Sequence, residues 1–109
     1  MAFDAGLAER MRDLLLTRQQ VSERKMFGGL AFMLGGHMCV GIIGETLMVR
    51  VGPLRYAEAL CRKHVREMDF TGKPMKGYVY VAPEGIAEDS ALEAWINLSA
   101  EFVASLPPK

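Results

Sequence analysis

The sequence has no excess of charge of either sign, because its 13 Lys and Arg residues balance its 13 Asp and Glu residues. Proteins that hold nucleic acid by bulk electrostatics neutralise several phosphates with surplus Lys and Arg. The balance therefore argues against direct nucleic-acid binding as the main activity.

The sequence also lacks long hydrophobic runs and a basic leader. No uninterrupted apolar segment approaches the ~20 residues that span a bilayer. Asp4 and Glu9 interrupt the N-terminus, where a secretory signal needs a basic region followed by an apolar one. We therefore expect no membrane segment and no secretory signal.

Cysteine is scarce, with two residues in a chain of 109. Secreted domains that rely on disulfides carry more cysteines and build smaller cores. Half of the residues are hydrophobic and 24% are charged, which is ordinary globular composition. We expect one domain over residues 1–109, with reduced thiols, in the cytoplasm.

The first half of the chain predicts one helix and three strands. Apolar residues recur at helical spacing after Asp4, a good capping residue, which predicts a helix over 4–17. Alternating apolar segments separated by glycine pairs predict strands over 24–34, 37–43 and 46–51. In the middle strand, Met38, Val40 and Ile42 are expected on one face, and His37, Cys39, Gly41 and Ile43 on the other.

The second half predicts two helices and two more strands. Pro53 suits the first position of a short helix that ends near Lys63. Strands are expected over 66–70 and 78–81. Ser90 and Glu93 form a predicted capping box for a last helix. Its apolar stripe contains Leu92, Trp95, Ile96, Ser99, Phe102, Val103 and Leu106, before Pro107 and Pro108.

The predicted order is α-β-β-β-α-β-β-α. Helices interspersed with antiparallel strands favour an α+β fold, a two-layer sandwich with the helices on one face of the sheet. Met33, Met48, Tyr78 and Tyr80 are candidates for the other face. An apolar open face is usually covered by a partner, often a second copy, so we expect a homodimer.

Several sequence strings resemble a known family. KMFGGLAFMLGGHMCVGI, LMVRVGP, MDFTGKPMKGYVYV and the closing SLPPK are similar to the TfoX N-terminal domain family, and the resemblance runs from about residue 9 to the end. It implies an α+β fold similar to type III secretion chaperones. It also implies a relation to regulators of natural competence, which help the cyclic-AMP receptor protein act at some promoters. The family supplies no catalytic residues to carry over.

The cysteines and histidines form two close pairs along the chain. His37 and Cys39 share one face of a predicted strand, and Cys61 and His64 lie near a predicted helix end. Four such ligands would suit tetrahedral zinc, but the pairs lack the usual two-cysteine knuckle. The favoured interpretation is structural, with a turn histidine, a small buried cysteine and a helix-terminal histidine. We expect neither a metal nor a cofactor.

No catalytic constellation stands out. A cysteine nucleophile needs an activating base and a third group that orients the base, and the sequence shows no motif that would supply them. The pairs Gly28-Gly29 and Gly35-Gly36 join strand to strand, with no Gly-Lys-Ser/Thr, so they are not a phosphate-binding loop. They are better explained as turn residues that permit positive φ or a bulge. We expect no enzyme activity.

The segment from Arg62 to Lys76 is the best candidate interaction surface. Residues 24–76 hold nine basic and four acidic residues, and the rest of the chain is correspondingly acidic. Basic side chains there lie among Phe70, Met75 and Tyr78, a mixture that could hold acidic groups or stack a base. The alternative is a solvated face over a core phenylalanine. The candidate residues are Arg62, Lys63, Arg66, Lys73, Lys76 and Tyr78.

The first functional hypothesis is therefore a non-catalytic regulatory domain that binds a protein partner, such as transcription machinery. The second is a protein that binds a small ligand or a metal, with a cryptic enzymatic activity. A deep polar pocket containing His37, Cys39 or His64 would favour the second hypothesis, and a flat apolar patch would favour the first.

Overall fold

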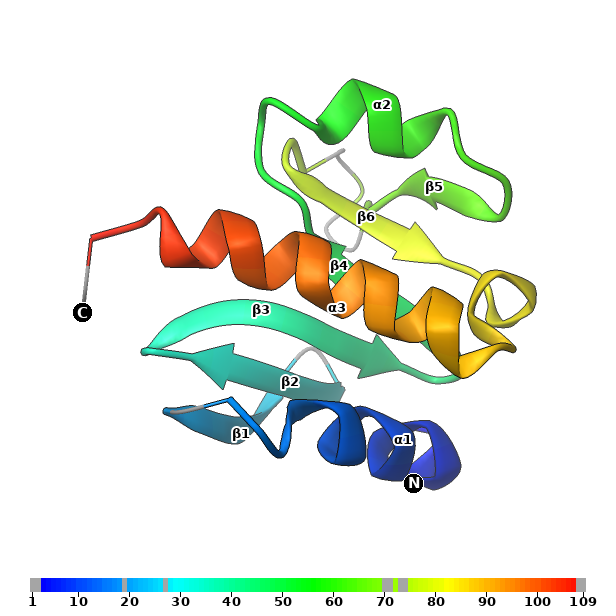
Figure 1. Cartoon of the computed structure of the whole chain (residues 1–109). Coiled ribbons are helices and arrows are strands. Elements are labelled where there is room, and N and C mark those ends of the chain that lie inside the picture. Colours follow the sequence, from blue (N-terminus) through cyan, green and yellow to red (C-terminus); the bar gives the residue numbers. More distant parts are fainter. Residues whose placement is uncertain (1–2, 19, 27, 70–71, 73–74, 108–109) are drawn as a thin grey trace.

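The computed structural model describes residues 3–18, 20–26, 28–69, 72 and 75–107. It forms an open antiparallel sheet with three α-helices (Figure 1). The elements in chain order are α1 (Ala5–Leu15), β1 (Val21–Met26), β2 (Gly29–Leu34), β3 (His37–Ile43), β4 (Thr46–Arg50), α2 (Tyr56–Leu60), β5 (Val65–Glu67), β6 (Tyr78–Val81), the 3-10 helix η1 (Pro83–Ile86) and α3 (Asp89–Ala104).

The sheet has six strands in the order β1-β2-β3-β4-β6-β5, and every neighbouring pair is antiparallel. The α+β class and the approximate order of elements are confirmed. The prediction of a single strand over 24–34 is wrong, because the chain turns at Gly28 and pairs β1 with β2 from Val21↔Leu34 to Met26↔Gly29. Gly28 has φ 72°, which favours glycine, and a Cβ at Gly29 would meet the Ile42 carbonyl oxygen at 2.0 Å.

β3 contains a bulge that changes which side chains share a face. Phe32 is opposite Val40 and Met33 is opposite Met38, so Cys39 has no residue of β2 opposite it. Two successive residues then point to the same side of the sheet. Cys39 packs in the main core with Val40 and Ile42, whereas Met38 joins the opposite face. The predicted strict alternation, with Met38 beside Val40, is therefore wrong.

All three helices pack on the face of the sheet that carries the main core (Figure 1). α3 crosses β3 and β4, α1 lies beside β1 and β2, and α2 packs on β5 and β6. The predicted stripe of α3 is buried at Leu92, Trp95, Ile96, Ser99 and Val103. The Ser99 hydroxyl donates a hydrogen bond of 2.7 Å to the carbonyl oxygen of Cys39, at the bulge.

The other face of the sheet carries a smaller, methionine-rich cluster. Met48 and Tyr80 lie there, as predicted, and both are buried. The segment after β5 covers them, because Met68 is fully buried against them and Met75 packs beside it. Burial raises the pKa of the Tyr80 hydroxyl. The middle of this face is therefore covered within the chain.

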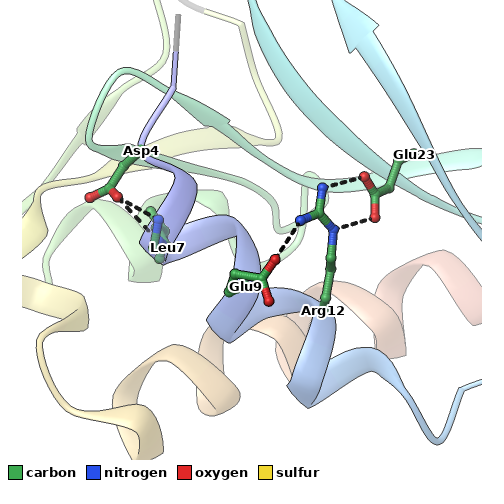
Figure 2. A network of polar contacts seen from close by, with 6 residues as sticks. Asp4, Leu7, Glu9, Arg12 and Glu23 are labelled. Carbon is green, nitrogen blue, oxygen red and sulfur yellow. Dashed lines mark hydrogen bonds and ion pairs between the residues drawn. The ribbon is translucent and has the colours of Figure 1, made fainter. Parts of the chain in front are cut away.

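The helix ends match the sequence only in part. Asp4 caps α1 as predicted, and its carboxylate accepts from the backbone N–H groups of Gly6 and Leu7 (Figure 2). The predicted capping box at Ser90 and Glu93 is wrong, because α3 begins at Asp89 without a side-chain cap. α2 begins at Tyr56, three residues after Pro53, and ends at Leu60.

Arg10 of α1 contacts the segment that leads into α3, where it binds carbonyl oxygens rather than the free N–H groups that a capping box would satisfy. Its guanidinium donates at 2.7 Å to the carbonyl oxygen of Ile86 and at 3.3 Å to that of Ala87. It also pairs with the carboxylate of Asp89 at 2.9 Å. A side chain 79 positions away in the sequence therefore connects α1 to the start of the last helix.

Arg12 connects α1 to the edge strand β1. Its guanidinium donates two hydrogen bonds, of 2.7 and 2.8 Å, to the two carboxylate oxygens of Glu23, and a third, of 3.1 Å, to Glu9 (Figure 2). A planar guanidinium matches a carboxylate in this forked geometry. The hydrogen bonds from Arg12 lower the pKa of Glu23 from its ordinary value of 4.5.

The Arg12–Glu23 fork predicts a pH-dependent contribution to stability. A lowered pKa in the folded state means that the contribution is complete above pH 4.5 and is lost as the pH falls through the lowered value. Arg12→Gln should therefore lower the urea midpoint at pH 7, with a smaller difference from the wild type at acidic pH. The matched control is Arg24→Gln, which removes an arginine next to Glu23 on β1 and should show no such pH dependence. Equal differences at both pH values would contradict the prediction.

The burial of Met68 on the methionine-rich face leads to a separate prediction about stability. Met68→Ala removes a fully buried side chain and should lower the free energy of unfolding by about 2–5 kcal/mol. Leu54→Ala, at a side chain that is 98% exposed, should change it by no more than about 0.5 kcal/mol. Urea unfolding followed by circular dichroism measures both. Similar small losses in the two variants would show that Met68 does not bury this face.

Candidate interaction surface

The predicted basic residues border the β5 edge of the sheet, but they do not form one continuous patch. Arg62 follows α2 and its guanidinium lies over the Trp95 ring of α3, at 5.0 Å from the centroid. Arg66, in β5, lies over the Tyr80 ring at 4.5 Å. Trp95 belongs to the helix-covered face and Tyr80 to the methionine-rich face. The two arginines therefore lie on opposite sides of the sheet edge.

The other members of the predicted surface have different environments. Lys63 is exposed in the turn between α2 and β5, and Lys76 is exposed just before β6. Tyr78 is half-buried at the start of β6. Lys73 and Phe70 lie outside the described residues. We call the set Arg62, Lys63, Arg66 and Lys76 the basic edge.

Carboxylates lie near both stacked arginines. Arg62 is 3.7 Å from Glu58, and Arg66 is 3.7 Å from Asp69. All four side chains are well exposed, so each pair contributes little to stability. A cation–π contact with an aromatic ring contributes about 0.5–1 kcal/mol to stability at exposed sites and restricts where the guanidinium can lie. The basic edge thus presents two arginines held by aromatic rings, and the neighbouring carboxylates reduce its net positive charge.

Arg50 is a similar residue that the sequence interpretation missed. Its guanidinium lies 5.6 Å from the Tyr78 centroid and 5.5 Å from the Phe102 centroid, and it donates a long hydrogen bond of 3.4 Å to the Met38 carbonyl oxygen. Register pairs Arg50 with Tyr78 across β4 and β6. The strand alternation alone could not place Phe102 beside it, because that ring comes from α3.

The two cysteines and two histidines do not converge. His37 and Cys39 belong to β3, whereas Cys61 and His64 lie between α2 and β5, on the far side of β4 and β6. His37 Nε2 lies 2.7 Å from the Pro107 carbonyl oxygen. Among the described residues, no three His, Cys, Asp or Glu side chains are grouped so that they could hold a metal ion.

The thiols differ in their surroundings. Cys39 is 1% exposed, and burial raises its pKa, which disfavours the thiolate that nucleophilic catalysis needs. Cys61 is exposed in the turn that follows α2. His37 lines a mostly apolar cavity of about 240 Å³ together with Leu34, Val103 and Leu106, and the geometry there provides no activated nucleophile.

The fold places this protein in the class of small α+β domains whose helices cover one face of an open antiparallel sheet. The model of the TfoX N-terminal domain family matches residues 13–103. The chain therefore belongs to the TfoX N-terminal domain family, which is not a known family of enzymes. No curated protein and no solved structure matches the chain.

Among the helices in the described part of the chain, none is long and apolar enough to cross a membrane.

Proposed function

We propose that this domain is a non-catalytic regulatory module of the cytoplasm that acts by binding a protein of the transcription machinery. The family supports a role of this kind at the level of competence and regulator-like domains. The observation that carries the proposal is the pair of stacked arginines on the basic edge. Trp95 and Tyr80 hold the two guanidinium groups in place, and both arginine side chains stay largely exposed and can donate to carboxylates of a partner.

A protein partner fits the basic edge better than a nucleic acid does. Arg62 and Arg66 lie on opposite sides of the sheet edge, and Glu58 and Asp69 are beside them. A phosphate backbone would meet these carboxylates as well as the arginines, and the whole chain has no surplus positive charge. An acidic protein surface with some basic groups matches this mixture of charges.

The test is capture of a partner by immobilised full-length protein from native lysate, followed by binding of the purified partner. Arg62→Glu with Arg66→Glu should weaken that binding by at least about tenfold, since two guanidinium contacts are replaced by repulsion. Arg24→Glu with Lys25→Glu reverses the same amount of charge on β1 and should leave the affinity unchanged. Equal affinities for the two double variants would refute the basic edge as the binding surface.

A homodimer is the second part of the proposal. Met38 and Ile43 are half-buried on the methionine-rich face, next to the part that Met68 and Met75 cover. Met33, also half-buried, is opposite Met38 in the register of β2 and β3 and so shares that face. Apolar side chains grouped on a sheet face favour contact with an equivalent face of a second copy. A two-fold contact there would leave the basic edges at the outside of the dimer.

The dimer is tested by light scattering during size-exclusion chromatography. The wild type should give twice the 12.1 kDa of one chain. Ile43→Glu places a charge in the proposed contact and should give the mass of one chain, whereas Leu54→Glu should remain dimeric. A single-chain mass for the wild type at micromolar concentration would rule the dimer out.

A further inference from the structure

A hollow opens between the C-terminal end of α1 and the edge strand β1, at the side of the sheet opposite to the basic edge. Its volume is about 390 Å³, which falls in the range of small-molecule sites. Half of its lining is apolar (Leu15, Leu16, Val21 and Phe32) and half is polar (Arg12, Arg18, Gln20 and Glu23). We call it the α1–β1 hollow.

Leu16 is a noteworthy part of this lining because its side chain is 77% exposed. Large apolar side chains of the described residues are otherwise covered at least in part, apart from Leu54. Leu15, its neighbour, is buried in the core and Val21 is half-buried. The hollow therefore offers an apolar wall with one leucine still in water, where an apolar group gains contact by entering.

Two guanidinium groups border the hollow, and they differ in their partners. Arg12 is committed to Glu23 and Glu9 through three hydrogen bonds, so its charge is neutralised (Figure 2). Arg18 donates from Nη2 to the amide oxygen of Asn97 at 2.5 Å, which is a neutral partner. All 13 Asp and Glu residues belong to the described part of the chain, and none of them forms an ion pair with Arg18.

We propose that the α1–β1 hollow binds a small amphipathic monocarboxylate, with its apolar chain against Leu16 and Val21, over the buried Leu15 and Phe32, and its carboxylate on Arg18. The planar guanidinium has donors left over after the bond to Asn97 and matches a carboxylate in geometry and charge. The Glu23 carboxylate also borders the hollow, but Arg12 already neutralises it, so Arg18 is the cation that stays free for an anion. An apolar wall with a few polar groups is the usual composition of a small-molecule site. This inference concerns a different surface from the basic edge and is independent of it.

The experiment titrates the ¹⁵N-labelled full-length protein with butyrate, hexanoate and octanoate, and with octanol as the uncharged counterpart of octanoate. Saturable shifts should appear at the amides of Leu16, Arg18 and Val21. Each added methylene that is buried should tighten binding by up to about fourfold. Octanol should bind about tenfold more weakly than octanoate, because it lacks the charged hydrogen bond to Arg18.

Two variants separate the charge from the apolar wall. Arg18→Gln should weaken octanoate binding about tenfold and leave octanol binding unchanged, whereas Leu16→Ser should weaken both ligands. Arg24→Gln on β1 is the control and should change neither. Equal affinities of the wild type for octanoate and octanol, equal effects of Arg18→Gln and Arg24→Gln, shifts centred on the methionine-rich face or no saturable shifts would each overturn the proposal. None of these outcomes involves the basic edge.

Discussion

The contact between Ser99 and the bulge at Cys39 fixes how the two layers of this domain meet. A bulge leaves a backbone group of β3 without its usual partner in β2, and an unpaired polar group in the core would cost about 1–3 kcal/mol. The fully buried Ser99, in the middle of α3, donates its hydroxyl hydrogen bond to the carbonyl oxygen of Cys39, the residue at the bulge. The apolar stripe of α3 could slide along the strands by itself, whereas a hydrogen bond to one carbonyl sets its position.

That position determines the surroundings of several arginines. With α3 fixed over β3 and β4, Trp95 in its first half lies under Arg62, and Phe102 in its last turn lies beside Arg50. Phe102 also closes on Gly52, where a Cβ would come within 2.4 Å of the ring. The orientation of these surface cations is thus a consequence of core packing, and it does not require strong ion pairs.

The features that the sequence predicted well depend on neighbours along the chain. Asp4 caps the first helix through the N–H groups two and three residues later, and the strands 37–43 and 78–81 have the predicted bounds. The errors depend on distant contacts. The bulge at Cys39 exists only relative to β2, and α3 begins one residue before the expected capping box, beside a contact with Arg10 from α1. The polar strand β1 has no clear apolar alternation to reveal it.

The candidate sites, too, were predictable where they depend on neighbours along the chain and were missed where they depend on distant contacts. Composition and spacing located the basic residues near β5, but the rings beneath Arg62 and Arg66 come from α3 and β6, so their placement on two faces could not be predicted locally. The α1–β1 hollow depends on where an 11-residue helix ends relative to a strand that the sequence only partly revealed.

Strand order then places the hollow beside β1 and the basic edge beside β5, at opposite sides of one sheet. Because the main core is continuous between them and the two surfaces share no side chain, a ligand in the hollow and a protein on the edge can be held at once.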